Sequence, residues 1–347
     1  MYSGSFDTLT GVPALRPCED ERKKARTRCL SKPASTEKLS IKTIILVIHG
    51  KKCNEGKGKR ELSEIRDMAK ARGVELLEVS TEREGHCEEL VRDANFHGID
   101  AVGIMGGDGT LREGVCGMIA RDMRAGQVPL FAFPCGTGNN FARDLGQQTV
   151  ADVFAAIARG CVHAVDAVCV HHPEGITYSI NCVTWGMARD AAATAEKMRW
   201  LGAIRYDIAG FYHILKNKLN YAKLAAYVDL GSNDDAPEET EDYMMVFAQN
   251  TRCSGRGFAF TPLAKLDDGM FDLVVVKKCG VLKTVRLFDA VKNGAGHVQD
   301  GSVCYVKVKK ATLAAKDSTD LVGIDGEVDV TTPIKLEVVE GAFKTFV

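Results

Sequence analysis

Hydrophobic and polar positions follow two different patterns along the chain. From residue 41 to about residue 160, short aliphatic runs take turns with longer segments whose apolar residues recur every three or four positions. The first kind predicts buried strands and the second predicts amphipathic helices. The predicted strands are Ile41–Ile48, Val74–Ser80, Ile99–Met105 and Val128–Phe133, and the predicted helices are Lys59–Ala71, Glu84–His97, one that ends near Arg124, and Val150–Ala158. Repeated strand–helix units predict a parallel, Rossmann-like sheet with helices on both faces.

After about residue 162 the pattern changes to strand-like runs that are joined by turns. The expected strands are Val162–Val170, Ile176–Val183, Ala222–Asp229, Tyr243–Ala248, Met270–Lys277, Val303–Lys309 and Ile334–Val339. Helical stretches interrupt them only near residues 196–217 and 281–292. This pattern predicts a second, mostly antiparallel domain that resembles a β-sandwich.

Composition narrows the classes of function. The chain has 347 residues, of which 45% are hydrophobic and 26% charged, so it can bury the cores of about two domains. A net charge of −1 gives no global attraction to nucleic acid. The twelve cysteines are spread singly, which is typical of reduced thiols in the cytoplasm. No aliphatic run approaches the ~20 residues that a membrane span needs.

Residues 1–40 mix small and polar residues with the basic cluster Arg22–Arg28. We expect this segment to be a disordered basic tail. A weak electrostatic contact with an anionic membrane is the alternative.

Two glycine-rich turns carry the candidate chemistry. Gly106-Gly107-Asp108-Gly109-Thr110 follows one predicted strand, and Gly136-Thr137-Gly138-Asn139 follows the next. A strand that ends in glycines and leads into a helix places free backbone N–H groups and a helix N-terminus around one spot, which attracts phosphate. The carboxylate of Asp108 repels phosphate, so its presence indicates a metal ion or a substrate hydroxyl at this spot.

Other motifs fit less well. The dinucleotide fingerprint needs a third glycine where Arg112 stands, and the stretch Gly50–Gly58 is one residue too long for a Walker loop. Ordinary connections of an α/β sheet are the remaining alternative for both turns.

The turns and their flanks resemble the diacylglycerol kinase catalytic-domain superfamily, which includes sphingosine and ceramide kinases. The resemblance runs from about residue 41 to residue 347. The first turn with Leu111-Arg112-Glu113 matches the GGDGT-L-x-E motif, and the second with Asn140–Arg143 matches GTGND-x-AR. Thr81 and Asp325-Gly326-Glu327 match an upstream threonine and a D-G-E motif. The block 184–207 is similar to the sphingosine and ceramide kinases.

This resemblance implies an ATP-dependent lipid kinase with Mg²⁺ held mainly by the ATP phosphates. It implies that residues 41–161 form a nucleotide-binding domain and residues 162–347 a lipid-binding domain. We expect Asp108 to act as the general base on the primary hydroxyl of a lipid, and Asp190 to lie near its head group. The expected nucleotide-binding residues are Thr81, Gly106, Gly107, Gly109, Thr110, Gly136, Thr137, Gly138, Asn139, Arg199, Arg205, Asp325 and Glu327.

Two departures from the family pattern bear on the substrate and the nucleotide. His49-Gly50 stands where the family usually has Asn-Pro. Ala192 stands where sphingosine kinases carry the acid that pairs with the substrate amine, which makes neutral ceramide or diacylglycerol more plausible.

Three hypotheses follow. The first is a kinase of a sphingoid base or ceramide, with diacylglycerol as the alternative lipid. The second is a soluble-substrate kinase such as an NAD kinase, and the third is a catalytically weak binding module. For the first we expect a cytoplasmic protein with transient peripheral membrane contact, a lipid partner and no nucleic-acid partner.

Overall fold

The computed structural model describes residues 29–31, 38–53, 56–121, 128–220, 225–229, 241–255, 258–315 and 319–347. The basic cluster, the end of the helix expected near Arg124 and the start of the strand expected at Ala222 lie outside these residues. The described chain divides into two compact units. We call Leu30–Ala167 with Glu340–Val347 the N-terminal unit, and Val168–Val339 the C-terminal unit.

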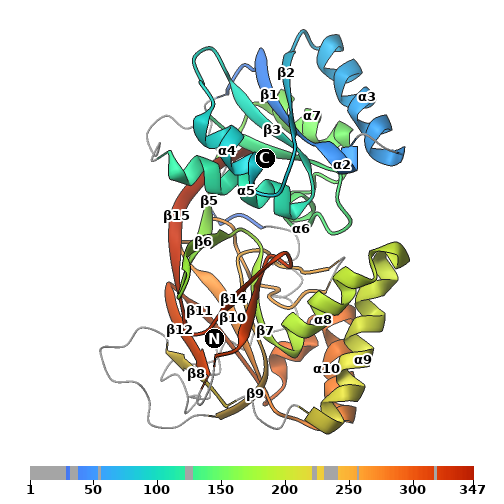
Figure 1. Cartoon of the computed structure of the whole chain (residues 1–347), viewed down its shortest axis with the longest axis vertical. Coiled ribbons are helices and arrows are strands. Elements are labelled where there is room, and N and C mark those ends of the chain that lie inside the picture. Colours follow the sequence, from blue (N-terminus) through green and yellow to red (C-terminus); the bar gives the residue numbers. More distant parts are fainter. Residues whose placement is uncertain are drawn as a thin grey trace. The chain divides into compact units, whose positions relative to one another are not determined.

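The N-terminal unit is a parallel sheet of four strands with helices on both faces (Figure 1). Its strand order is β2-β1-β3-β4, with β1 Thr43–His49, β2 Glu75–Thr81, β3 Ala101–Gly106 and β4 Leu130–Pro134. Its helices are α2 Gly50–Cys53, α3 Gly56–Ala71, α4 His86–Asp93, α5 Asp108–Ala120, α6 Asn140–Asp144 and α7 Val150–Arg159. The predicted α/β fold class is therefore confirmed.

The core of this unit forms where α3 and α7 pack on one face of the sheet. Alternate residues of β1, such as Ile44 and Leu46, point into this core because side chains alternate along a strand. Phe131 of β4 packs edge-on against Phe346 from the end of the chain, with ring centroids 5.5 Å apart. The last residues of the chain thus complete the core of the N-terminal unit, which local sequence patterns did not predict.

Glycine geometry explains one difference from the predicted helices. The sequence predicts a helix over Glu84–His97, whereas α4 spans only His86–Asp93. Gly85 precedes it with φ 77°, a left-handed conformation, and Ala94 after it is extended. The short helix α2 was not predicted.

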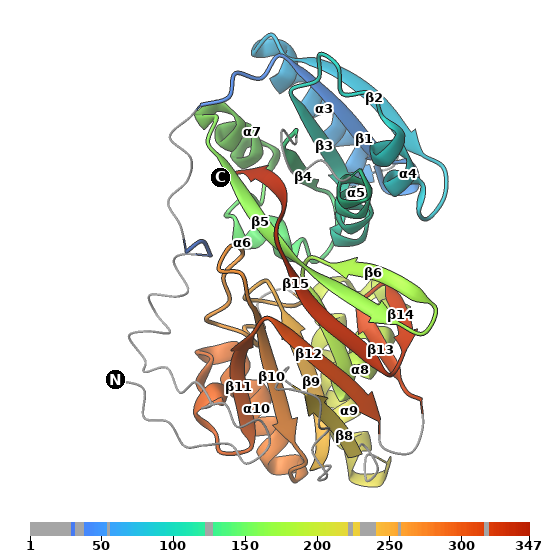
Figure 2. The same ribbon diagram turned by 90° about the vertical axis from the view of Figure 1, so that its left-hand side faces the viewer.

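The C-terminal unit is built mainly from antiparallel strand pairs that enclose a common core (Figure 2). Strands β5 and β15 contribute residues to both units. The strands are β5 Val162–His172, β6 Gly175–Ser179, β7 Cys182–Gly186, β8 Ala225–Asp229, β9 Glu241–Gln249, β10 Phe271–Lys277, β11 Val303–Val308, β12 Lys310–Ala315, β13 Leu321–Ile324, β14 Val328–Thr331 and β15 Ile334–Phe346. Their order is β14-β13-β7-β9-β8-β12-β15-β5-β6, with β10 between β9 and β11. The architecture is the predicted antiparallel β-sandwich.

Helices cover one side of β9, β10 and β11, where Met187, Ile214 and Leu287 pack together with the strands. They are α8 Met187–Lys197, the 3-10 segment η1 Arg199–Ile204, α9 Arg205–Asn220, α10 Val281–Asn293 and the 3-10 segment η2 Gly296–Gln299. The stretch predicted as one helix near 196–217 is broken in the structure, because Gly202 adopts the non-helical angles φ 63° and ψ −136°.

The single strand predicted over Ile176–Val183 is wrong, because this segment forms two strands. Strand β6 pairs with β5, whereas β7 pairs with β9 and β13. The Asp325 carboxylate holds the turn between them, since it accepts hydrogen bonds from the Ser179 hydroxyl at 2.7 Å and from the Cys182 N–H at 2.8 Å.

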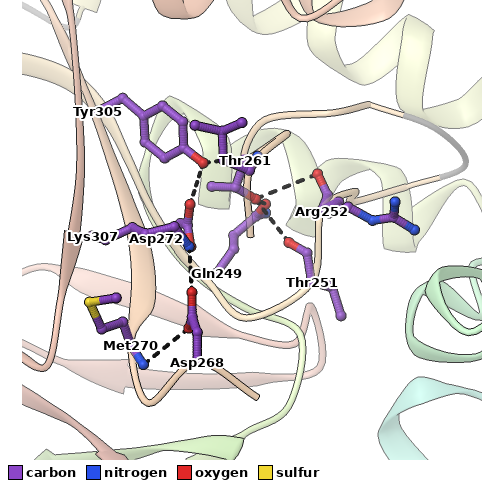
Figure 3. A network of polar contacts seen from close by, with 10 residues as sticks. Gln249, Thr251, Arg252, Thr261, Asp268, Met270, Asp272, Tyr305 and Lys307 are labelled. Carbon is purple, nitrogen blue, oxygen red and sulfur yellow. Dashed lines mark hydrogen bonds and ion pairs between the residues drawn. The ribbon is translucent and has the colours of Figure 1, made fainter. Parts of the chain in front are cut away.

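A buried polar network ties the long β9–β10 connection to the sheet (Figure 3). Asp272, which is fully buried, accepts from Lys307 at 2.7 Å and from the Tyr305 hydroxyl, and that hydroxyl accepts from the Leu263 N–H at 3.0 Å. Lys307 also donates to Asp268 at 2.9 Å. Burial raises the pKa of the Asp272 carboxyl, and Lys307 opposes that shift. The satisfied network fixes a connection that has little regular structure.

Candidate phosphate-binding and catalytic site

The two glycine turns leave the sheet side by side. Gly106 at the end of β3 is in register with Pro134 at the end of β4. The Cys135 N–H donates to the Gly106 carbonyl at 2.8 Å, which continues the pairing past the strands. The carboxyl ends of adjacent parallel strands are where open α/β sheets bind ligands. Both predicted turns therefore lie next to each other at the carboxyl edge of the sheet.

Close approach explains why these positions are glycines. A Cβ atom on Gly136 would lie 2.7 Å from the Cα of Gly107, so the two turns touch backbone to backbone. A Cβ on Gly106 would lie 2.7 Å from the Cβ of Thr110. A Cβ on Gly138 would lie 3.2 Å from the Asp108 carboxylate. A side chain at position 136 would therefore require the backbone to move, whereas at positions 106 and 138 it would displace neighbouring side chains.

Asp108 is the first residue of α5, and its carboxylate lies at the start of α6. It accepts hydrogen bonds from the Asn140 N–H at 3.0 Å and from the Phe141 N–H at 3.4 Å. A helix N-terminus favours a negative charge, so these two N–H groups orient the carboxylate. Asp108 itself belongs to the first turn and begins α5, whereas its carboxylate lies beside the second turn.

The second turn is held by its own asparagine. Asn139 has the left-handed angle φ 49°, and its side-chain amide exchanges two hydrogen bonds of 2.9 Å with the backbone of Gly136. This leaves the Asn139 side chain engaged within the turn. A contact of Asn139 with nucleotide, as expected from the resemblance, remains a prediction.

Thr81 lies at the same carboxyl edge of the sheet, at the end of β2. Its hydroxyl accepts from the Gly50 N–H at 3.3 Å. A Cβ on Gly50 would lie 2.4 Å from the Thr81 carbonyl oxygen, so this position requires glycine. The His49-Gly50 departure from the family pattern thus has a local structural reason.

Glu113 has a role that the sequence did not reveal. Its carboxylate accepts from the Gly85 N–H at 3.0 Å and from the Cys87 N–H at 3.2 Å. These groups lie at the N-terminus of α4, which otherwise has no side-chain cap. Glu113 therefore joins α5 to α4 behind the first turn.

Cysteine thiols next to the turns are packing groups. The Cys53 Sγ donates to the Met105 carbonyl at 3.3 Å and lies 3.6 Å from the Cys135 Sγ. The hydrogen bond from Cys53 and burial raise the pKa of the Cys135 thiol, which keeps it protonated.

The polar atoms around the turns fit a bound triphosphate. Arg143 donates to the Gly138 carbonyl at 3.4 Å, while its buried Nε has no partner among the described residues. An unsatisfied buried donor beside N–H-rich turns is what an anion would bind. Within the described ranges, no cluster of acidic, histidine or cysteine side chains could hold a metal ion by itself. That Mg²⁺ is held mainly by the ATP phosphates stays a prediction.

The remaining predicted residues lie in the C-terminal unit. Asp190 in α8 pairs with Arg189 at 3.2 Å, and Arg189 also bonds Asp329 of β14 at 3.0 Å. One helical turn further on, the Thr194 hydroxyl lies 2.7 Å from the His213 Nε2. Burial lowers the pKa of His213. Polar side chains thus line the α8–α9 contact next to Asp190.

The guanidinium of Arg205 is buried, and only part of its hydrogen-bonding capacity is used within the described residues. The residue is 3% exposed. Its Nη2 donates to Glu196 at 2.9 Å and to the Tyr206 hydroxyl at 2.8 Å. Its Nε and Nη1 have no partner among the described residues. Because a buried charge is costly when its donors are unsatisfied, this group fits an anionic oxygen. The side chain of Arg199 lies outside the described residues.

Asp325 and Glu327 belong to the turn between β13 and β14. Asp325 has the left-handed angle φ 51°, and its carboxylate is engaged by the β6–β7 turn as described above. Glu327 is exposed on the same turn. The structure therefore gives Asp325 a structural role, and nucleotide binding by either residue stays a prediction.

Comparison with protein families gives two matches that together span most of the chain. Residues 44–170 match the diacylglycerol kinase catalytic domain. Residues 181–347 match the YegS C-terminal NAD kinase beta sandwich-like domain. Among the described residues, no helix is long and apolar enough to cross a membrane.

Several curated proteins are about 25% identical in sequence to this chain. Sphingosine kinase 1 of Arabidopsis thaliana is 25% identical over 310 residues, which cover 76% of this chain and 64% of the plant protein. Sphingosine kinase 1 of Homo sapiens is 26% identical over 304 residues, covering 74% of this chain and 78% of the human protein. A diacylglycerol kinase of Mycobacterium tuberculosis is 26% identical over 279 residues, which cover 79% of this chain and 85% of the mycobacterial protein.

The chain spans 64% and 66% of the lengths of the two Arabidopsis sphingosine kinases, which is less than two thirds. Among solved structures, a diacylglycerol kinase from Bacillus anthracis superposes with a TM-score of 0.65 at 20% identity, covering 89% of this chain and 98% of that one. At this identity the superposition supports the fold alone.

The contact between the two turns can be tested by adding one methyl group. Gly136→Ala should lower stability by about 1–3 kcal/mol, as overpacking does, because the Cβ meets backbone rather than a movable side chain. Gly301→Ala is the matched control, since that Cβ would meet nothing within 4 Å and the residue does not adopt the left-handed conformation. Thermal unfolding of both variants measures the difference, and equal melting temperatures would contradict the close contact.

Proposed function

Because the chain belongs to the diacylglycerol kinase catalytic-domain superfamily, we propose that it is an ATP-dependent lipid kinase that phosphorylates the primary hydroxyl of a sphingoid base or ceramide. The observation that carries this proposal is the position of the Asp108 carboxylate. It lies against two glycine turns of the kind that attracts phosphate, and two N–H groups orient it.

The chemistry asked of the protein is mainly positioning and charge stabilisation. Backbone N–H groups of the two turns hold the ATP phosphates. Asp108 accepts the proton of the lipid hydroxyl while the hydroxyl oxygen of the lipid forms a bond to the γ-phosphorus. The bond between the γ-phosphorus and the β,γ-bridging oxygen breaks. ADP leaves with the electron pair. Mg²⁺ supplies neutralising charge when the nucleotide is bound.

Arg199 and Arg205 are proposed ligands of nucleotide phosphate. The buried guanidinium of Arg205 supports this role, because two of its donor nitrogens lack partners among the described residues. Glu196 and Tyr206 hold it in place from the other side. A planar guanidinium suits phosphate oxygens better than a point charge does.

The choice of lipid is the finer part of the proposal. Relatives named sphingosine kinase are 25–27% identical to this chain and a relative named diacylglycerol kinase is 26% identical, so identity does not separate the two classes. The block 184–207 favours sphingoid lipids. Ala192 in α8 offers no carboxylate to an ammonium group, so Asp190 is the proposed head-group acid. Diacylglycerol is the second candidate.

A lipid kinase must reach its substrate at a membrane surface, and α9 presents an apolar stripe suited to that contact. Ile208, Phe211, Tyr212 and Leu215 of α9 continue the spacing of Ile204 at the end of η1, and each of the five is 42–57% exposed. Trp200 in the preceding 3-10 segment is 81% exposed. Exposed lysines flank the stripe at Lys197 and Lys216, which favours an anionic membrane surface. We propose that this apolar stripe makes the peripheral membrane contact.

Substitution of the proposed base tests the activity. The measurement is transfer of labelled phosphate from ATP to sphingosine, ceramide, diacylglycerol and NAD. Asp108→Ala should lower turnover on the preferred lipid by roughly 10²–10⁴-fold, as expected for the loss of a general base. The dissociation constant for ATP should change much less, because the backbone donors remain. Asp93→Ala, which removes an exposed carboxylate of α4, is the matched control.

Two outcomes would contradict the proposal. If the parent protein phosphorylates none of the lipids, or phosphorylates NAD alone, it is not a lipid kinase. If Asp108→Ala turns over at the rate of Asp93→Ala, another residue is the base.

Vesicle binding tests the apolar stripe. The double substitution Phe211→Ser, Leu215→Ser should weaken cosedimentation with vesicles of phosphatidylcholine and phosphatidylserine, because it removes the exposed apolar surface of α9. Ile176→Ser is the control, since Ile176 is 59% exposed on β6. Phosphorylation of a lipid dispersed in detergent should be unchanged in both variants. Equal vesicle binding by the two variants would show that the stripe does not contact the membrane.

A further inference from the structure

The side-chain amide of Asn181, in the turn between β6 and β7, has no partner that the fold supplies. The residue is 1% exposed. Neither its Nδ2 nor its Oδ1 has a hydrogen-bond partner among the described residues. A buried amide whose donor and acceptor are both unsatisfied is unfavourable, and native proteins rarely contain one. These two atoms therefore require a partner from outside the described chain.

The main chain of Asn181 is held on both sides. Its N–H donates to the Asp325 carboxylate at 3.0 Å, and its carbonyl accepts from the Asn250 N–H at 3.0 Å. The same carboxylate accepts from the N–H groups of Ile180 at 3.0 Å and Cys182 at 2.8 Å. The amide of Asn181 is therefore carried by a backbone that cannot easily move to find other partners.

The neighbouring end of β9 is fixed as well. The Thr251 hydroxyl, just after β9, lies 3.4 Å from the Asn181 carbonyl. The Thr251 carbonyl accepts from the Thr261 hydroxyl at 2.9 Å (Figure 3). Groups that are held in place before a ligand arrives lose little entropy when it binds. The polar turn at this edge of the antiparallel sheet is thus preorganised around an unsatisfied amide.

The chemistry of the amide specifies its ligand. The Nδ2 group only donates, and Oδ1 only accepts. Phosphate and ester oxygens only accept, and an ammonium only donates, so none of these groups satisfies both atoms. A hydroxyl donates and accepts, so one hydroxyl or two neighbouring ones can satisfy both. A trans secondary amide fits less well, because its N–H and C=O point in opposite directions.

We infer that Asn181 is a binding residue that recognises a neutral hydroxyl group of a substrate, an inference that rests on the proposed function. Two substrates of the proposed reaction carry such a group. One is the ribose of ATP, and the other is the second hydroxyl of a sphingoid lipid, which is not phosphorylated. Apart from its reacting hydroxyl, diacylglycerol offers only ester oxygens. Recognition of a lipid hydroxyl would therefore select sphingoid lipids over diacylglycerol.

Thermal unfolding without ligand is the first test. Asn181→Leu keeps the branching of the side chain and Asn181→Ala adds no bulk, and neither removes a side-chain hydrogen bond of the described chain. At least one of the two variants should therefore melt no earlier than the parent. Asn293→Leu, at an exposed asparagine of α10, is the matched control. If both Asn181 variants melt well below the control, the amide is bonded within the chain and the inference is wrong.

Binding of matched hydroxyl and deoxy ligands is the second test. The dissociation constant of ATP is compared with those of 2′-deoxy-ATP and 3′-deoxy-ATP, and that of sphinganine in detergent with that of its 3-deoxy analogue. The parent and Asn293→Leu should bind the hydroxyl form in one of the two comparisons about tenfold more tightly. Both Asn181 variants should lose that preference. The comparison that responds identifies the ribose or the lipid as the ligand.

These binding measurements separate the inference from the proposed function. A parent that transfers no phosphate to any lipid contradicts the proposed function, whereas the dissociation constants still judge the role of Asn181. A parent that ignores the hydroxyl in both comparisons overturns the inference, because the amide then binds water alone. A hydroxyl preference that persists in both Asn181 variants overturns it too, because another residue then makes the contact.

Discussion

The candidate site depends on the backbone contact between the turns that follow β3 and β4. A Cβ on Gly136 would lie only 2.7 Å from the Cα of Gly107, so both turns must be nearly bare backbone. This contact lets α5 and α6 begin close together, and it lets the Asp108 carboxylate reach the N–H groups of Asn140 and Phe141. The α/β core of the N-terminal unit serves to hold two adjacent strands so that their turns meet.

Local patterns predicted much of this architecture because its strands are apolar and its helices periodic. The strands and helices of the N-terminal unit appear where expected, within a few residues. Some errors are local, because Gly85 and Gly202 adopt non-helical conformations, and others occur where distant residues decide. Ile176–Val183 reads as one strand, yet the carboxylate of Asp325, far along the chain, holds a turn at its middle. The final strand runs to Phe346 and enters the N-terminal core, which no neighbouring residue signals.

Local sequence patterns also predicted only part of the candidate site. The glycines and Asp108 could be identified because their chemistry is unusual for their position. Glu113 could not be interpreted, since the N–H groups it caps lie 26 and 28 residues away. The buried donors of Arg205 emerge only when α8 and α9 pack together. Asp325 shows the converse case: a motif residue whose carboxylate is already occupied by backbone N–H groups.

Hydrogen exchange of backbone amides in the presence of Mg²⁺ and a non-hydrolysable ATP analogue tests the central claim most directly. If the two turns hold the triphosphate, the amides of Gly107–Thr110 and Thr137–Asn139 should exchange more slowly together when the analogue binds. AMP, which lacks the β- and γ-phosphates, should protect them much less. Binding of the analogue with no change in exchange at either turn would contradict the account, because the phosphates would then lie elsewhere.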